Sequence, residues 1–253
     1  MIEELLPRPV ATAEAFGDPA GEPVPFPGEE HLLAHAVPAR RREFTTARAC
    51  ARRALGLLGE PRAAIPYDSS RAPVWPAGIV GSITHCVGYR AAAVARAEDL
   101  AVLGFDAEPH DPLDHTGVLH MVTGAEERAH LAELTALRPE VHWDRALFSA
   151  KESVYKAWSP LTGRWLDFTE ATVTFQPRTA TFSARLLVDG PLVDGVALRG
   201  FEGRFLVRGG LLLTATTVSR VPGAASGADN GPDLGAARRF RAGQPLARSR
   251  GTP

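Results

Sequence analysis

Two carboxylates close a predicted buried strand. Asp106 and Glu108 end the segment GFDAE at residues 104–108, directly after an apolar run. Alternation along a strand puts both side chains on the same face. Two like charges at this spacing repel each other unless a cation or water lies between them, so the pair predicts a platform for Mg²⁺. The alternative is an ordinary strand end that enters a solvated turn.

The two lysines of the chain form a second cluster. Of 28 Lys and Arg residues, only Lys151 and Lys156 are lysine, and Glu152 lies between them in the segment FSAKESVYK. Lys carries a compact ammonium, which arginine does not imitate. A carboxylate flanked by two ammonium groups suits a metal-bridged pyrophosphate, because the metal takes the carboxylate and the cations take phosphate oxygens. The alternative for Glu152 and Lys156 is an ordinary i,i+4 ion pair on a helix.

A third segment gathers hydrogen-bonding side chains after a short strand. Residues 81–86 read GSITHC and contain Ser82, Thr84 and His85. The chain has neither a G-x-S-x-G elbow nor a glycine-rich phosphate loop, so a serine hydrolase and a P-loop nucleotide site are both disfavoured. The alternative for His85 is a purely structural histidine.

The elements that must position these residues follow a helix-then-strands order that occurs twice. Apolar periodicity predicts helices at 38–58, 123–137 and 143–158 and strands at 79–83, 91–95, 101–105, 171–176, 181–188, 204–208 and 211–218. Thr123 with Glu126 predicts a capping box, and Pro160 with Gly163 predicts the end of the last helix. The first 30 residues are expected to form extended segments and turns, and 109–122 a loop.

This order predicts an α+β fold of two similar halves, residues 1–108 and 109–220. Each half is small for an independent domain, so we expect the two to pack together as a pseudo-dimer. Residues 221–253 are rich in Gly, Ala, Pro, Ser and Arg without periodicity, which predicts a disordered tail.

Composition excludes several classes of protein. The 253 residues are 45% hydrophobic with net charge −1, which excludes a wholly disordered chain. No apolar run is long enough to span a membrane, and two cysteines make neither a disulfide framework nor a zinc site. The acidic start lacks the features of a signal peptide, so we expect a cytoplasmic protein. Six Arg and one Glu at residues 40–53 form a local basic stripe, not the basic domain of a nucleic-acid binder.

Taken in order, the three segments resemble the Sfp-type 4′-phosphopantetheinyl transferases, in particular the actinobacterial branch of the enterobactin-synthetase component D-like group. Residues 44–52, 71–76, 156–158 and 164–165 add to the resemblance, which covers about residues 5–218. It implies an enzyme that transfers 4′-phosphopantetheine from coenzyme A (CoA) to a serine of apo acyl or peptidyl carrier proteins and releases 3′,5′-ADP. Such carriers serve fatty-acid, polyketide and nonribosomal-peptide synthesis. Because the two halves are fused in one chain, we expect a monomer. The active site is expected in the cleft between the two halves.

The resemblance also implies a role for each candidate residue. Asp106, Glu108 and Glu152 would hold Mg²⁺, or alternatively Mn²⁺. Glu152 would act as general base on the carrier serine, directly or through a metal-bound water, and Lys156 would stabilise the transition state. The residues implied in CoA binding are Arg40, Arg48, Arg71, Thr84, His85, Asp106, Lys151 and Lys156. Trp165 would line the channel for the pantetheine arm.

Two rival functions use the same residues. A Mg²⁺-dependent phosphohydrolase or nuclease also needs clustered carboxylates and a lysine, but its Glu-x-Lys motif belongs on a strand, whereas Lys151 precedes Glu152 on a predicted helix. A non-catalytic module that binds CoA or a carrier protein would not need the full set of carboxylates and lysines that this chain retains.

Overall fold

The computed structural model describes residues 1–21, 24–68, 71–113 and 116–220, all of which lie in one compact unit. The helices are α1 (Pro38–Leu57), α2 (Thr116–Val122), α3 (Ala125–Leu137) and α4 (Trp143–Thr162), with short 3₁₀ turns η1 (Ile2–Glu4), η2 (Glu30–Leu33) and η3 (Phe168–Glu170). The strands are β1 (Ala11–Phe16), β2 (Ile79–Cys86), β3 (Tyr89–Arg96), β4 (Leu100–Pro109), β5 (Ala171–Gln176), β6 (Thr181–Leu186), β7 (Leu192–Val193), β8 (Val196–Ala197), β9 (Gly200–Arg208) and β10 (Leu211–Ser219). The fold is α+β with antiparallel sheets, as the sequence predicts.

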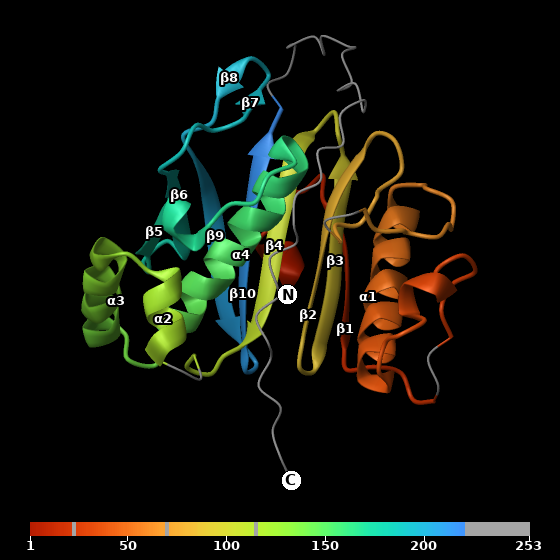
Figure 1. Ribbon diagram of the computed structural model, residues 1–253, viewed down its shortest axis with the longest axis horizontal. Coiled ribbons are helices and arrows are strands. Elements are labelled where there is room, and N and C mark those ends of the chain that lie inside the picture. The colour runs from red at the N-terminus through yellow and green to blue at the C-terminus, as the bar shows by residue number, and fades with distance from the viewer. Residues whose placement is uncertain (22–23, 69–70, 114–115, 221–253) are drawn as a thin grey trace. The chain divides into compact units, whose positions relative to one another are not determined.

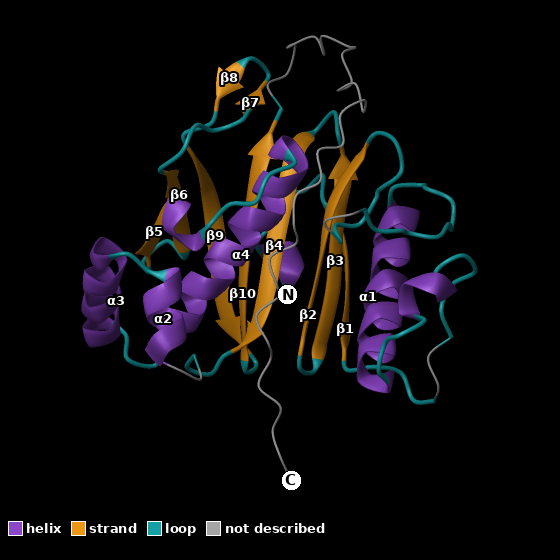
Figure 2. Cartoon of the chain, viewed as in Figure 1, coloured by secondary structure: helices purple, strands orange, loops and turns teal. Residues whose placement is uncertain are grey.

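Helix α4 packs across the larger sheet (Figure 2), whose five strands are ordered β4-β10-β9-β6-β5. Its apolar stripe includes Trp143 and Trp158, both almost fully buried. The Trp143 ring lies edge-on to Phe205 with the ring centroids 5.6 Å apart, and Phe175 joins the same cluster. Burial of large aromatic side chains is a strong stabilising contribution, so α4 is firmly fixed on this sheet.

Helix α1 packs on the smaller sheet, ordered β1-β3-β2. The facing surfaces are built from small side chains, among them Ala51 and Ala54 of α1 and Ala92 of β3, each without exposed surface. Small residues let the helix approach the sheet closely. The predicted helix at 38–58 is therefore confirmed to within one residue.

Strands β2 and β4 bring the two sheets together without a regular ladder (Figure 1). Hydroxyl groups of β2 bridge the gap: Phe105 N donates to Ser82 Oγ at 3.4 Å, and Ala107 N donates to Thr84 Oγ1 at 3.3 Å. The sequence-based division at residue 108 assigned the strand at 101–105 to the N-terminal half. In the structure β4 forms its ladder with β10 of the larger sheet, and the division into two halves stays a prediction.

Gly104 lets β4 and α4 approach each other backbone to backbone. A Cβ atom at this position would lie 2.1 Å from Ser153 O and 2.7 Å from Ala157 N. No other residue type fits there without separating the strand from the helix. The separation of β4 and α4 is thereby set two residues before Asp106.

Three local predictions differ from the structure. Segment 109–122, expected to be a loop, contains helix α2, which has no strong periodicity. Strand β1, by contrast, fits the extended segments expected at the start of the chain. Helix α3 begins after Gly124, and Glu127 rather than Glu126 caps it, because its Oε2 accepts Gly124 N at 2.9 Å. Helix α4 continues past Pro160 and ends at Thr162, and Gly163 follows as its C-cap with φ at +63°. A proline in the last turn removes only one hydrogen bond, and the left-handed glycine then ends the helix.

In the described part of the chain, none of the helices is both long enough and apolar enough to cross a membrane. The predicted tail at 221–253 lies outside the described residues.

Candidate active site

Lys156 and Asp106 form the centre of the site. Lys156 projects from α4 and its Nζ donates to Asp106 Oδ1 at 2.7 Å, to Phe105 O at 3.2 Å and to Thr84 Oγ1 at 3.3 Å. The Thr84 hydroxyl donates to the same Asp106 oxygen at 3.0 Å. Three elements, β2, β4 and α4, therefore meet at one carboxylate oxygen, and each contributes a residue from one of the three sequence motifs.

The second oxygen of Asp106 is a buried acceptor without a partner. Asp106 is 4% exposed, and its Oδ2 has no hydrogen bond among the described residues. A buried, unsatisfied carboxylate oxygen is costly in a folded protein and indicates a ligand that the oxygen would bind.

Glu108 lies on the same side of β4, as strand alternation predicted. Its Oε2 is 3.1 Å from Arg145 Nη1 of α4. Burial and the charge of Asp106 raise the pKa of Glu108 to about 7, against the opposing effect of Arg145 and Lys156. Burial is the main cause, and repulsion from Asp106 adds to it; a cation bound between the two carboxylates would relieve that repulsion.

Glu152 follows on α4 and lines a cavity of about 640 Å³ together with Tyr155 and Lys156. Burial raises the pKa of Glu152, and the charge of Asp106 raises it further, while Lys156 lowers it. A carboxylate with a raised pKa is a better proton acceptor near neutral pH, which is the property that a general base needs.

The donor set fits a divalent cation, although the ligands are not assembled as a closed cage. Among the described residues, no group of three or more His, Cys, Asp or Glu side chains is arranged to hold a metal ion. Mg²⁺ is usually held by one or two carboxylates together with waters and substrate phosphates, so a preformed cage is not required. The unpartnered Asp106 Oδ2 is the observation that supports the fit.

A second cavity of about 560 Å³ collects the predicted cationic residues of the N-terminal half. Arg40, Arg48, Arg71 and His85 all line it. It adjoins the cavity at Glu152, because Arg71, Pro73 and Ile83 line both. Together the two cavities make an elongated site with Arg40 and Arg48 at one end and Glu152 and Lys156 at the other.

His85 lies between Arg40 and Glu43 at the cationic end. Its Nε2 is 2.5 Å from Arg40 Nη1, and its Nδ1 is 3.7 Å from Glu43 Oε2. Burial and the neighbouring Arg40 charge lower the pKa of His85 to about 4. The imidazole is therefore neutral at physiological pH and accepts from Arg40 in the free protein.

Two local contacts fix the orientation of the Arg48 guanidinium. Its Nε donates to Ile65 O at 3.0 Å, and its Cζ lies 4.6 Å from the centre of the Phe44 ring. Burial lowers the pKa of Arg48 to about 10, so it stays protonated at neutral pH. An arginine fixed at the wall of a cavity suits an anionic group such as a phosphate.

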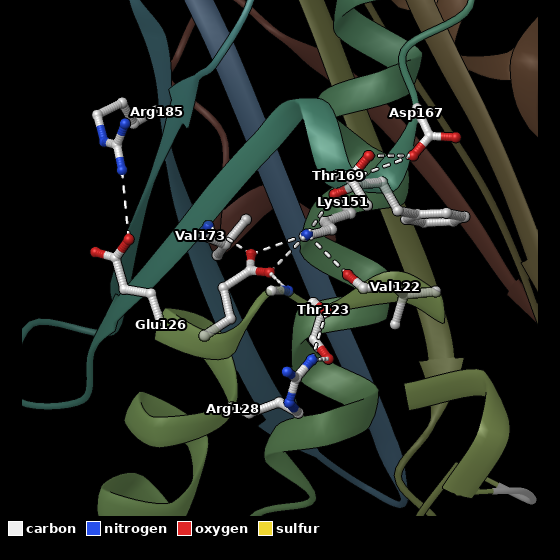
Figure 3. Close-up of polar contacts among 12 residues, drawn as sticks. Val122, Thr123, Glu126, Arg128, Lys151, Asp167, Thr169, Val173 and Arg185 are labelled. Atoms are coloured by element: carbon white, nitrogen blue, oxygen red, sulfur yellow. Dashed lines mark hydrogen bonds and ion pairs between the residues drawn. The ribbon is translucent and has the colours of Figure 1, made fainter. Parts of the chain in front are cut away.

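Lys151 does not face the candidate site. It was expected to contact CoA phosphates, but Figure 3 shows its ammonium turned into the fold. Nζ donates to Phe168 O at 2.6 Å, to Val122 O at 2.8 Å and to Glu127 Oε2 at 2.9 Å. Both Lys151 and Glu127 side chains are 3% exposed. All three protons of the ammonium are used, so Lys151 joins α4 to α3 and to η3 and is not available to a phosphate.

Trp165 stands beside the site on the surface. Its ring centroid is 4.6 Å from that of Tyr155, which lines the cavity at Glu152. The Trp165 side chain is 63% exposed. Its role in a pantetheine channel stays a prediction.

Sequence reasoning missed three residues of this region, Glu43, Arg145 and Tyr155. Glu43 lies one helical turn after Arg40, a spacing that signals an i,i+3 ion pair. No sequence pattern points to Arg145, because its partner Glu108 is 37 residues away. Tyr155 lies within the FSAKESVYK segment, where nothing in its spacing marks it as a separate site residue.

Comparison with known proteins decides the family. A profile described as the 4′-phosphopantetheinyl transferase N-terminal domain matches residues 28–95, and one described as the 4′-phosphopantetheinyl transferase superfamily matches residues 102–192. The chain is 55% identical over 227 residues to 4′-phosphopantetheinyl transferase Svp of Streptomyces mobaraensis, which covers 89% of this chain and 92% of that protein. It belongs to the 4′-phosphopantetheinyl transferase family.

Two further relatives support this assignment. The chain is 48% identical to 4′-phosphopantetheinyl transferase Npt of Nocardia iowensis, over 85% of this chain and 98% of that protein. It is 45% identical to 4′-phosphopantetheinyl transferase PptT of Mycobacterium tuberculosis, over 85% of this chain and 96% of that protein. The second family profile begins at residue 102, within β4. The chain is an enzyme of the transferase class.

Proposed function

We propose that this transferase moves 4′-phosphopantetheine from CoA to a serine of apo acyl or peptidyl carrier proteins in a Mg²⁺-dependent reaction. The observation that carries the proposal is the pair of adjoining cavities that meet at Arg71, Pro73 and Ile83. The cationic cavity suits the 3′-phosphoadenosine end of CoA, and the cavity at Glu152 and Lys156 suits the pyrophosphate and the pantetheine arm. We assign the site to the region where β2 meets β4 and α4, and a cleft between two similar halves is part of the proposal.

In the cationic cavity, Arg40 and Arg48 are assigned to the 3′-phosphoadenosine and His85 to its 3′-phosphate. Arg48 is already directed by Ile65 O and Phe44, so little freedom is lost when a ligand binds. Arg40 can exchange its contact with His85 for one with a phosphate oxygen. Arg71 lies at the junction of the cavities, where it can reach a phosphate from either side.

At the other end, the proposed reaction forms a bond between the serine Oγ and the phosphorus of the phosphopantetheine group. The bond from that phosphorus to the bridging oxygen breaks, and 3′,5′-ADP leaves with the oxygen. Glu152 accepts the serine proton, directly or through a water. Lys156, oriented by Asp106 and Thr84, stabilises the charge that develops on the phosphate oxygens.

Asp106, Glu108 and Glu152 would hold Mg²⁺, which supplies charge neutralisation at the pyrophosphate. The unpartnered Asp106 Oδ2 and the repulsion between the Asp106 and Glu108 carboxylates support this role. Mn²⁺ has similar ligand preferences and is the alternative cation.

The proposal retains the monomeric state and cytoplasmic location expected from the sequence. Carrier proteins of fatty-acid, polyketide and nonribosomal-peptide synthesis are the proposed partners.

The test is the intact mass of an apo carrier protein after incubation with the enzyme, CoA and Mg²⁺, with EDTA in a parallel sample. A gain of one phosphopantetheine group that requires metal supports the proposal. If CoA is instead hydrolysed without any carrier, a phosphohydrolase is favoured. CoA binding without turnover on any carrier would favour a binding module.

A further inference from the structure

We propose that Arg145 is a positioning residue that holds Glu108 and the segment after β4 in the arrangement needed for metal binding. This inference rests on the proposed function, because it concerns the carboxylates assigned to Mg²⁺. Arg145 itself contacts protein groups in the structure and is not assigned to substrate.

The Arg145 guanidinium contacts three separate points. Nη1 lies 3.1 Å from Glu108 Oε2, Nε donates to Asp111 O at 3.1 Å, and Nη2 donates to Pro112 O at 2.9 Å. The side chains of Arg145 and Glu108 are 13% and 20% exposed, so this ion pair is more shielded than an ordinary surface pair. One planar group therefore fixes the carboxylate and the backbone beyond it at the same time.

The neighbouring residue of α4 strengthens the same connection. Asp144 Oδ2 accepts Leu113 N at 2.8 Å. Asp144 and Arg145, adjacent residues near the start of α4, therefore both bind the backbone of residues 111–113. Arg145 binds two carbonyl groups and Asp144 binds one amide. The chain that leaves β4 is thereby attached to the helix that carries Glu152 and Lys156.

Arg145 and Lys156 play matching parts for the two carboxylates of β4. Lys156 occupies Oδ1 of Asp106, and Arg145 occupies Oε2 of Glu108. The two cations are 11 residues apart on α4, about three turns, so they project from one face of the helix. In each carboxylate one oxygen is bound to a cation of α4, and Asp106 Oδ2 has no hydrogen-bond partner. Outer-sphere partners that orient a ligand in this way strengthen metal binding.

Lysine cannot reproduce the contacts of Arg145. A single ammonium can keep the charge beside Glu108, but it cannot extend a planar fork to Asp111 O and Pro112 O simultaneously. The charge-conserving variant Arg145→Lys therefore separates positioning from simple charge balance. Arg145→Met removes both the charge beside Glu108 and the contacts with Asp111 O and Pro112 O.

The experiment measures Mn²⁺ binding to CoA-saturated enzyme, without carrier protein, by the paramagnetic resonance signal of free Mn²⁺. We expect Arg145→Lys and Arg145→Met to bind Mn²⁺ about 10-fold to 100-fold more weakly than the wild type. The metal concentration for half-maximal transfer should rise in parallel, while the KM for CoA at saturating metal stays near the wild-type value. The matched control is Arg138→Lys, because Arg138 forms an exposed ion pair with Glu140.

Mn²⁺ affinity of Arg145→Lys within twofold of the wild type, or tighter, would overturn the inference even if thermal stability falls. If Arg145→Met does not fold, Arg145→Lys decides the question alone. If the wild type modifies carriers and Arg145→Lys binds Mn²⁺ as tightly as the wild type does, only this inference is overturned. A wild-type enzyme that neither binds Mn²⁺ nor modifies a carrier would remove the proposed function and the inference with it.

Discussion

Lys156 Nζ lies 2.7 Å from Asp106 Oδ1, and the Thr84 hydroxyl donates to that same oxygen at 3.0 Å. The Lys156 side chain is 25% exposed and that of Asp106 is 6% exposed. The ammonium is therefore oriented by two neighbouring elements and still has a side that reaches the cavity. A cation held in place before the ligand arrives does not have to reorganise during the reaction, which is the condition for effective electrostatic catalysis.

Lys156→Arg is expected to lower the kcat for carrier modification by roughly 100-fold. The guanidinium is planar and wider than an ammonium, so it cannot occupy the space between Asp106 Oδ1, Thr84 Oγ1 and Phe105 O. The rate is measured by intact mass at saturating CoA, and Arg138→Lys is the control. Retention of a third or more of the wild-type rate would show that the ammonium itself is not required.

Asp106→Asn is expected to abolish metal-dependent transfer while the protein stays folded. The amide oxygen still accepts from Thr84 and Lys156, but the group no longer carries the charge that a divalent cation requires. Transfer and Mn²⁺ binding are measured together. Transfer near the wild-type rate at the same Mg²⁺ concentration would contradict the assignment of Asp106 to the metal.

Lys151→Met is expected to destabilise the fold without weakening CoA binding. The variant leaves the buried Glu127 carboxylate without its cation, a change that costs about 3–5 kcal/mol in other buried pairs. The free energy of unfolding is measured in urea, and CoA affinity by calorimetry. The double variant Lys151→Met with Glu127→Leu should recover part of the stability. If CoA affinity drops while stability is unchanged, Lys151 contacts the ligand after all.

Gly104→Ala is expected to reduce stability and transfer together. Its Cβ would lie 2.1 Å from Ser153 O, so β4 and α4 must separate, and overpacking of this kind costs about 1–3 kcal/mol. Gly56→Ala is the matched control, because a Cβ there has no neighbour within 4 Å. The control should be neutral or slightly stabilising, as expected for alanine in a helix. Equal thermal transitions of Gly104→Ala and the wild type would contradict the close contact.

His85 gives the free enzyme a defined dependence on pH. Its pKa in the fold is about 4, below the ordinary value of 6.5, because of burial and Arg40. The unfolded chain therefore binds more protons than the fold between these values. The stabilising contribution is present above pH 6.5 and is lost as the pH falls through 4. His85→Gln should lose less stability than the wild type on acidification over this range, as measured by urea unfolding.

CoA binding should raise the pKa of His85. A phosphate beside His85 favours the charged imidazolium and raises its pKa, so CoA binding near pH 6 should take up protons. Calorimetry in buffers of different ionisation enthalpy measures this uptake. The wild type should take up more protons than His85→Gln. Equal uptake by both proteins would place the 3′-phosphate away from His85.

Much of the fold could be predicted from local patterns. The helix of α1 and the strands β2 to β4 follow from periodicity, and three ordered motifs placed Asp106, Thr84 and Lys156 in one site. The partner of β4 could not be predicted, because β10 comes about one hundred residues later and strand pairing over such a distance leaves no local signal. Helix α2 is too short to show clear periodicity.

The lysine cluster shows where reasoning from spacing failed. Lys151 and Lys156 are five residues apart, which turns the helix by roughly 140°, so the two side chains cannot face the same site. Lys156 faces β4, and Lys151 faces Glu127 and the α2–α3 connection. Helical geometry therefore already argued against two phosphate-binding lysines, although nothing in the sequence identified Glu127 as the partner. Arg145 was missed because its contacts with Glu108, Asp111 and Pro112 depend on tertiary structure alone.

The side chains of β4 alternate between two environments, and a substitution that changes one side of the strand also affects the other. Leu103, Phe105 and Ala107 point into one hydrophobic cluster, whereas Gly104, Asp106 and Glu108 face α4. A substitution that shifts the strand to fill space on its apolar side displaces the carboxylates on the other. Random mutagenesis of this strand should therefore yield few variants that gain thermal tolerance and keep their turnover, and evolution toward a new carrier is expected to leave β4 nearly untouched while altering the surrounding surface.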